Sequence, residues 1–226
     1  MPVIVLLRHG LSSANVSGIL AGRAAGVSLT DEGVGALEAN LRLLPNRRFA
    51  RLIHSPLRRC VQTAEIARQA AEIEHSAEDE AVIELDYGDW TGRRLKELAS
   101  EPLWATVLDR ASLARFPGGE SIAEAADRSV ARVHALVAEL RDAEADRDAE
   151  TKEKPLWGMI VSHGDIIKSI IADALGMPLD DFQRLSVAPG SFTVIDYSGT
   201  RPVLAAMSVT AAGLGQSGAV GGGGMR

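Results

Sequence analysis

Short apolar runs separated by longer amphipathic segments set the pattern of this chain. Pro2–Leu7 is one such run, rich in Val, Ile and Leu, and Trp157–Ser162 is another. Their length and β-branching favour strands that are buried on both faces, as in parallel sheets. Further strands are predicted at Arg51–His54, more weakly at Ala81–Leu85, and at Phe192–Tyr197 and Pro202–Val209 as a hairpin or two neighbouring strands.

Helix signals lie between these runs. Thr30 is a predicted N-cap that precedes two acidic residues and a face of leucines, and Pro45 ends that helix. Ser121 and Glu124 form a capping box at the start of a long helix. The other predicted helices run from the Ser55-Pro56 dipeptide through about Ala71, and over Ile166–Leu175 with Gly176 as its C-cap.

The alternation of strands and helices predicts an α/β fold, a three-layer α/β/α sandwich around a mostly parallel central sheet. Arg8–Ser28 is polar and contains glycine, which predicts a long irregular loop, and such loops often carry function. We expect a single domain over residues 1–210. The Gly-rich residues 211–226 predict a flexible C-terminal tail.

Charge and cysteine content narrow the class of protein. The 226 residues include 30 acidic and 24 basic side chains, a formal net charge of −6, which argues against nucleic acid or an anionic membrane as a general partner. The single cysteine, Cys60, excludes an internal disulfide and a cysteine-cluster metal site. No apolar run reaches transmembrane length and no signal peptide is recognisable, so the expected location is cytoplasmic.

Two histidines occupy matching positions. His9 and His163 each come just after a predicted buried strand, and each precedes a glycine. Ligands of open α/β sheets gather at the carboxyl ends of the strands, so the two side chains are predicted to share one crevice. A lone histidine at a strand end is more often structural, but two in matching contexts indicate a site.

Cationic groups accompany the histidines. Arg8 precedes His9, and Arg58 and Arg59 fall in the first turn of a predicted helix, with Asn15 a short loop away. Guanidinium groups bind phosphate oxygens in pairs of hydrogen bonds, and a helix N-terminus favours anions. The set predicts a phosphoryl-binding site, although one of the adjacent arginines is expected on a solvated helix face.

These motifs resemble the histidine phosphatase superfamily, also called the phosphoglycerate mutase-like family, in its phosphatase-type branch. Five signatures stand in family order and together cover most of the chain from Val3 to about Val209. They are Arg8-His9-Gly10 with Asn15, Ser55–Ala64, Glu84–Gly92, Phe116–Ser121 and Val161–Gly164. The resemblance implies the phosphoglycerate mutase-like fold.

The resemblance also implies roles. His9 would be the nucleophile that forms a phosphohistidine, and Glu84 the proton donor. Arg8, Arg59 and His163 would hold the phosphoryl oxygens, with Asn15 and Gly164 also binding phosphate. The remaining candidate substrate contacts are Ser12, Gly22, Arg23, Tyr87, Arg93 and Arg94. The implied reaction is hydrolysis of a small phosphate monoester without a metal ion or cofactor, and a homodimer is the general expectation for such families.

Other functions stay open at this stage. A phosphoglycerate mutase would return the phosphoryl group to the substrate. In that branch arginine follows the acid, and a pair of arginines further along the chain binds the substrate carboxylate. Here Leu85 follows Glu84, and Arg110 and Arg115 are separated from each other in the sequence. Arg93 and Arg94 keep that alternative open as anchors for an acidic substrate. A metal hydrolase would use His9, Glu84, His163 and Asp165, but arginines beside those ligands oppose a cation.

A non-catalytic phosphate-binding module is a further alternative, which predicts the loss of His9, Glu84 or Arg59, and none of these is lost. Several residues have structural interpretations. His54 is expected to be packed, His75 and His134 to lie on the surface, and Cys60 to be a small core side chain. Trp90 is as compatible with the core as with the wall of a substrate site.

Overall fold

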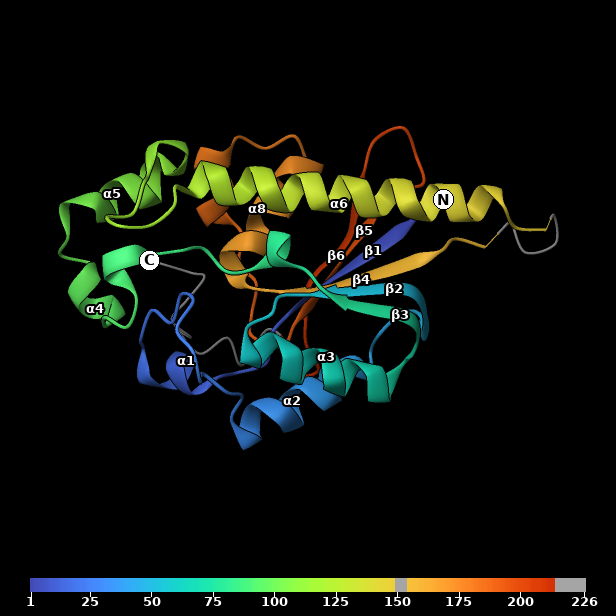
Figure 1. Cartoon of the computed structure of the whole chain (residues 1–226), viewed down its shortest axis with the longest axis horizontal. Helices are drawn as coiled ribbons and strands as arrows, with labels where there is room; N and C mark the ends of the chain where they lie inside the picture. The colour runs from blue at the N-terminus through green and yellow to red at the C-terminus, as the bar shows by residue number, and fades with distance from the viewer. Residues whose placement is uncertain (149–153, 214–226) are drawn as a thin grey trace.

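A six-stranded sheet forms the centre of the molecule (Figure 1). The computed structural model describes residues 1–148 and 154–213. The strand order is β3-β2-β4-β1-β5-β6; β3, β2, β4 and β1 are parallel, and β5 and β6 run antiparallel to their neighbours. The strands are β1 (Val3–Arg8), β2 (Arg48–His54), β3 (Glu72–Glu78), β4 (Trp157–Ser162), β5 (Phe192–Asp196) and β6 (Val203–Val209).

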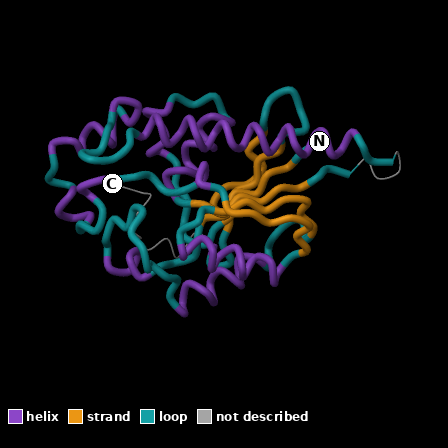
Figure 2. Tube along the Cα trace, in the orientation of Figure 1, coloured by secondary structure: helices purple, strands orange, loops and turns teal. Residues whose placement is uncertain are grey.

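Helices cover both faces of the sheet and make three layers (Figures 1 and 2). One face carries α2 (Asp31–Leu41) and α3 (Arg58–Ala70), and the other carries α6 (Ile122–Ala145) and α8 (Gly164–Ala174). The short helices lie beyond the carboxyl end of β1, opposite the N-terminus in Figure 1. They are α1 (Ser13–Ser17), α4 (Leu95–Leu98) and α5 (Pro102–Asp109). Short 3-10 turns occupy Glu80–Val82, Gly88–Trp90, Ala111–Leu113 and Leu179–Arg184.

The core divides into two apolar clusters because successive side chains of a strand point to opposite faces. In β1, Val5 and Leu7 belong to the cluster that includes Leu37 of α2. Leu6 of the same strand belongs to the other cluster, with Ile167 of α8. β1 is buried along its whole length, and it therefore holds its carboxyl end rigidly between two packed layers.

The predicted α/β sandwich with a mostly parallel sheet is confirmed, but the strand predicted at Ala81–Leu85 is wrong. Glu80–Val82 forms a 3-10 turn capped by Asp79, and the strand beside β2 is Glu72–Glu78. β3 is an edge strand whose side chains are largely exposed, so its polar sequence carries no apolar run or alternation. The sequence therefore did not predict this strand, because it lies at the edge of the sheet.

Two local predictions are also corrected. The polar loop after β1 contains α1, a five-residue helix that the Ser12 and Asn15 capping box starts but that is too short to show periodicity. Ser55 does not cap α3: the helix begins at Arg58 after Leu57, and no side chain caps it. The capping box of Ser121 with Glu124 and the hairpin of β5 with β6 are confirmed.

No helix within residues 1–148 and 154–213 is long and apolar enough to cross a membrane. The division into one domain and a tail from residue 211 stays a prediction, because residues 214–226 lie outside the described part of the chain.

Candidate active site

The sheet topology brings the two histidines together. β1 and β4 are parallel neighbours, and their register pairs Arg8 with Ser162, the last residue of each strand. The next residues, His9 and His163, therefore leave the sheet side by side, and their ring centroids lie 5.3 Å apart. β2 is the other neighbour of β4, which places Ser55 beside the same strand end.

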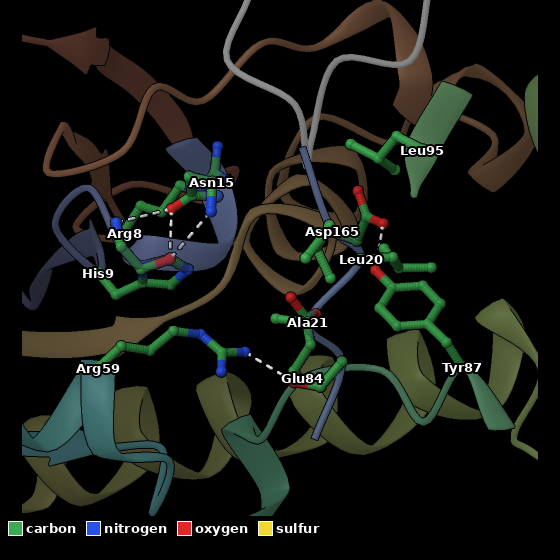
Figure 3. Close-up of a pocket in the computed structure, with 13 residues that line it drawn as sticks. Arg8, His9, Asn15, Leu20, Ala21, Arg59, Glu84, Tyr87, Leu95 and Asp165 are labelled. Atoms are coloured by element: carbon green, nitrogen blue, oxygen red, sulfur yellow. Dashed lines mark hydrogen bonds between the residues drawn. The ribbon is translucent and has the colours of Figure 1, made fainter. Parts of the chain in front are cut away.

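A small cavity of about 30 Å³ lies at this edge (Figure 3). Arg8, His9, Asn15 and Arg59 lie on one side of the view, and Leu20, Tyr87, Leu95 and Asp165 lie on the other. The lining residues are Arg8, His9, Ser12, Asn15, Ile19, Leu20, Ala21, Gly22, Arg59, Glu84, Tyr87, Leu95 and Asp165. The cavity thus has a cationic half and an apolar and acidic half.

His9 is a buried, neutral imidazole. Its Nδ1 lies 2.8 Å from the carbonyl oxygen of Gly10, which can only accept, so Nδ1 carries the proton and Nε2 keeps its lone pair. Burial, followed by the charges of Arg59 and Arg8, holds the pKa of His9 well below its usual range. Nε2 is therefore available as a nucleophile at neutral pH.

Arg8 and Arg59 supply the positive charge. Both are buried, with 3% and 2% of their surface exposed. Arg8 donates to the carbonyl oxygen of Val187 at 2.5 Å, and Arg59 donates from Nη2 to the carbonyl oxygen of Gly22 at 2.9 Å. These contacts hold two guanidinium groups at the cavity, where they can bind phosphate oxygens.

His163 lies next to Arg59, outside the cavity lining. It is fully buried and does not line the cavity. Arg59 Nη2 lies 3.1 Å from its Nδ1 and can only donate, so Nε2 carries the proton and donates to Ser55 Oγ at 2.8 Å. Burial and the neighbouring Arg59 charge hold the pKa of His163 well below its usual range. The residue connects α3 to the β4 end.

Glu84 faces the cavity with a raised pKa. Its Oε1 accepts from the backbone N–H of Leu85 at 3.0 Å, and its Oε2 lies 3.8 Å from His163 Nδ1. Burial, followed by the nearby charge of Asp165, raises the pKa of Glu84 to about 7. A carboxyl group with this pKa can both give and take a proton near neutral pH.

The structure places the other predicted residues unequally. Ser12, Asn15, Gly22 and Tyr87 line the cavity, whereas Gly164, Arg23, Arg93 and Arg94 do not. Arg23 donates to the carbonyl oxygen of Glu84 and to Glu120, and Arg93 pairs with Glu101. Asn15 accepts from Ser12 through its Oδ1, which fixes the turn that follows His9.

Comparison with known proteins agrees with this geometry. The family model described as histidine phosphatase superfamily (branch 1) matches residues 4–210. The chain belongs to the histidine phosphatase superfamily. The resemblance inferred from the five motifs is thereby confirmed.

Relatives of this chain include phosphatases and mutases. Glucosyl-3-phosphoglycerate phosphatase of Mycolicibacterium vanbaalenii is 30% identical, with 80% of this chain and 78% of that protein covered. 2,3-bisphosphoglycerate-dependent phosphoglycerate mutase of Thermoplasma acidophilum is 26% identical over 93% of this chain and 95% of that protein. The native structure of mycobacterial glucosyl-3-phosphoglycerate phosphatase has a TM-score of 0.75 at 25% identity, covering 92% of this chain and 98% of that chain. The chain is accordingly an enzyme of this superfamily.

Asp165 lines the cavity, whereas the sequence suggested it only as a metal ligand of an alternative metal hydrolase. It lies in the first turn of α8, where its Oδ2 accepts from Tyr87 Oη at 2.8 Å and its Oδ1 lies 3.2 Å from Lys168 Nζ. A signal was present in the sequence: Asp165 and Lys168 are an i,i+3 charged pair among the isoleucines at the start of a mostly apolar helix. Charges in such a segment need partners or a function.

Residues with structural interpretations lie where expected. His54 and Cys60 are buried, and His75 and His134 are exposed. Arg58 is exposed while its neighbour Arg59 is buried, so one of the pair is solvated. Trp90 is 3% exposed and packs on Phe116 and Trp104, which makes it a core residue.

No group of three or more His, Cys, Asp or Glu side chains that could hold a metal ion occurs within the described ranges. His9 and the carboxyl groups that line the cavity instead share it with Arg8 and Arg59, whose positive charge opposes a cation.

Burial of Glu84 makes the stability of the protein depend on pH. Between the ordinary glutamate pKa of 4.5 and the raised value of about 7, the unfolded chain has lost a proton that the folded state keeps. The free energy of unfolding should therefore fall by about 1.4 kcal/mol per pH unit across this window, and no further above it. In Glu84→Gln this contribution is absent.

Urea denaturation of the wild type and Glu84→Gln at pH 5 and pH 8 measures the effect. The wild type should lose more stability than the variant between the two pH values. Equal losses in both proteins would show that Glu84 titrates in its ordinary range.

Proposed function

We propose that this protein is a phosphatase that hydrolyses small phosphate monoesters through a phosphohistidine formed on His9. One observation carries the proposal: the unprotonated Nε2 of His9 shares a small cavity with two buried arginines and a carboxyl group whose pKa is about 7. These are a nucleophile, an anion site and a proton donor, the three parts that transfer of a phosphoryl group requires.

The first half-reaction transfers the phosphoryl group to the enzyme. The lone pair of His9 Nε2 attacks phosphorus, and the bond between phosphorus and the ester oxygen breaks on the opposite side. Protonated Glu84 gives its proton to the departing oxygen, so the product leaves as an alcohol. The phosphoryl group stays on His9, and the two guanidinium groups balance its charge.

The second half-reaction releases phosphate. Glu84, now a carboxylate, takes a proton from a water molecule that attacks the phosphohistidine. The bond between Nε2 and phosphorus breaks, and its electron pair returns to the neutral imidazole. The hydrogen bond from Nδ1 to the Gly10 carbonyl oxygen keeps the ring in the orientation needed for both steps.

The oxygen-binding roles follow from placement. Arg8 and Arg59 reach the cavity directly, and Asn15 lies at its wall. We assign His163 to hold Arg59 through Nδ1, since direct contact with phosphate requires that side chain to move. We also assign a cytoplasmic location, a reaction without metal or cofactor, and no nucleic-acid substrate, the last supported by the net charge of −6.

Phosphate release and isomerisation distinguish a phosphatase from a mutase. The purified enzyme is incubated with an aryl phosphate, a panel of sugar phosphates and 3-phosphoglycerate, the last with and without its bisphosphate activator, and each with and without EDTA. We expect phosphate release that EDTA does not change. Efficient isomerisation of 3-phosphoglycerate with negligible release would establish the mutase instead, and full sensitivity to EDTA would establish a metal hydrolase.

A further inference from the structure

The charges of the cavity wall are divided between its two halves. Among the described residues that line it, the cationic side chains are Arg8 and Arg59, which lie beside His9 where the phosphoryl group must bind. The opposite half holds Leu20, Leu95 and the carboxylate of Asp165 (Figure 3). An ester bound with phosphorus at His9 therefore directs its alcohol toward apolar and acidic side chains.

Asp165 is held in that wall by two buried partners. Tyr87 donates to one carboxylate oxygen, and Lys168 contacts the other. Lys168 is fully buried, lies 5.4 Å from the centre of the Phe182 ring and does not line the cavity. The ion pair thus presents its negative end to the substrate and its positive end to the protein interior.

Two arginines near the cavity, Arg23 and Arg93, are paired with other carboxylates. Arg23 forms ion pairs with Glu120 at 3.0 Å and Asp86 at 3.8 Å. Arg93 pairs with Glu101 at 2.5 Å. The two phosphoryl charges already match Arg8 and Arg59, so a further negative charge on the alcohol would meet a carboxylate and no unmatched cation of the described cavity wall.

We propose that Asp165 is a specificity residue that excludes anionic alcohols, and that the substrates are phosphate monoesters whose alcohol carries no negative charge. The inference rests on the proposed phosphatase activity, which it deepens by naming the substrate class. Exclusion works by repulsion: an unwanted substrate is disfavoured by a like charge that the correct one does not meet. The apolar residues Leu20 and Leu95 contribute contact area without charge.

Glycerol 3-phosphate and 3-phosphoglycerate, taken as matching enantiomers, test the proposal because they differ only in a terminal hydroxymethyl group or carboxylate. The readout is the kcat/KM for phosphate release from each ester, expressed as a ratio. The wild type should favour glycerol 3-phosphate, and Asp165→Asn should shift the ratio toward the carboxylate-bearing ester by about tenfold. Asn keeps the size of Asp and can still accept from Tyr87.

Matched variants distinguish the effect of removing the Asp165 charge from a disturbance of the structure. Asp165→Glu keeps the charge and should keep the preference, and Asp127→Asn makes the same change at an exposed position of α6 and should leave both kcat/KM values unaltered. If unpaired Lys168 prevents Asp165→Asn from folding, the double variant Asp165→Asn/Lys168→Met removes both charges and should show the same shift.

The outcomes distinguish this inference from the function on which it rests. A wild type that hydrolyses neither ester nor any aryl phosphate contradicts the phosphatase itself. A wild type that releases phosphate but shows no preference, or a preference that Asp165→Asn leaves within twofold, contradicts only the role of Asp165.

Discussion

Replacing His9 with asparagine should abolish phosphate release, lowering kcat by at least about 10⁴-fold, the scale seen when a covalent nucleophile is lost. The side chain of asparagine is polar and short, but it has no lone pair comparable to that of Nε2. The two arginines and Glu84 remain, so the variant should still bind inorganic phosphate. The expected result is thus a loss of turnover with binding retained.

A trapped intermediate gives a direct readout of the same role. Wild-type enzyme mixed with an aryl phosphate and quenched in alkali should carry one phosphoryl group per chain, and His9→Asn should carry none. Mass spectrometry of the intact protein measures this. A phosphorylated His9→Asn protein would assign the nucleophile to another residue.

His54 offers a matched control. It is the last residue of β2, it is buried, and its Nδ1 lies 3.1 Å from the carbonyl oxygen of Ser55, the same local arrangement as in His9. His54 does not line the cavity. His54→Asn should therefore perturb stability as His9→Asn does and leave kcat within a few-fold of the wild type. Comparable losses of kcat in the two variants would indicate a structural effect.

Glu84→Gln should lower kcat/KM for alkyl phosphates by about 10²- to 10⁴-fold, the usual contribution of a general acid. Gln keeps the size of Glu and an oxygen for the Leu85 N–H, but it has no proton to give. Aryl phosphates have a leaving group that departs without protonation, so their first half-reaction should be affected much less. The variant should then accumulate phosphohistidine, because the base for the second half-reaction is also lost.

The pH profile of the wild type should reflect the same group. The donor must be protonated, so kcat/KM for alkyl phosphates should fall as the pH rises through about 7, the raised pKa of Glu84. Because the pKa of His9 is held well below its usual range, the acid limb should lie well below pH 6.5. Glu84→Gln should lose the alkaline limb and keep the acid limb.

Glu38→Gln makes the same substitution at an exposed position of α2 and should leave the profile unchanged. If Glu84→Gln loses as much activity on an aryl phosphate as on an alkyl phosphate, and no phosphoenzyme accumulates, then Glu84 is not the proton donor.

The sequence predicted the parallel core because its strands have strong local signals. Pro2–Leu7 and Trp157–Ser162 are apolar enough to be buried on both faces, and the structure buries them. β3 escapes prediction because an edge strand is stabilised by its pairing with β2, and its own side chains stay exposed. Pairing with a distant segment leaves no pattern in the strand's own residues.

The candidate site likewise has features that the local sequence predicts and others that depend on contacts with distant segments. His9 and His163 are predicted together because both follow buried strands, and parallel pairing alone is sufficient to bring their backbones together. The local sequence predicts Ser55 as a helix cap, but the fold turns its hydroxyl toward His163. Arg93 is a candidate anchor by sequence, but it pairs with Glu101. Side-chain partners of this kind come from segments whose relative placement the local sequence does not encode.

The sequence by itself determined which chemical groups this protein has and at which ends of its strands and helices they lie. One histidine follows β1, a second follows β4, and two arginines begin α3. Only the tertiary structure decided the protonation states of these groups and which side chains surround them. The lowered pKa of His9, the raised pKa of Glu84 and the carboxylate of Asp165 in the cavity all arise from burial and from charges on distant segments. Burial and charge proximity are properties of the packed chain, because they depend on which segments exclude water from which.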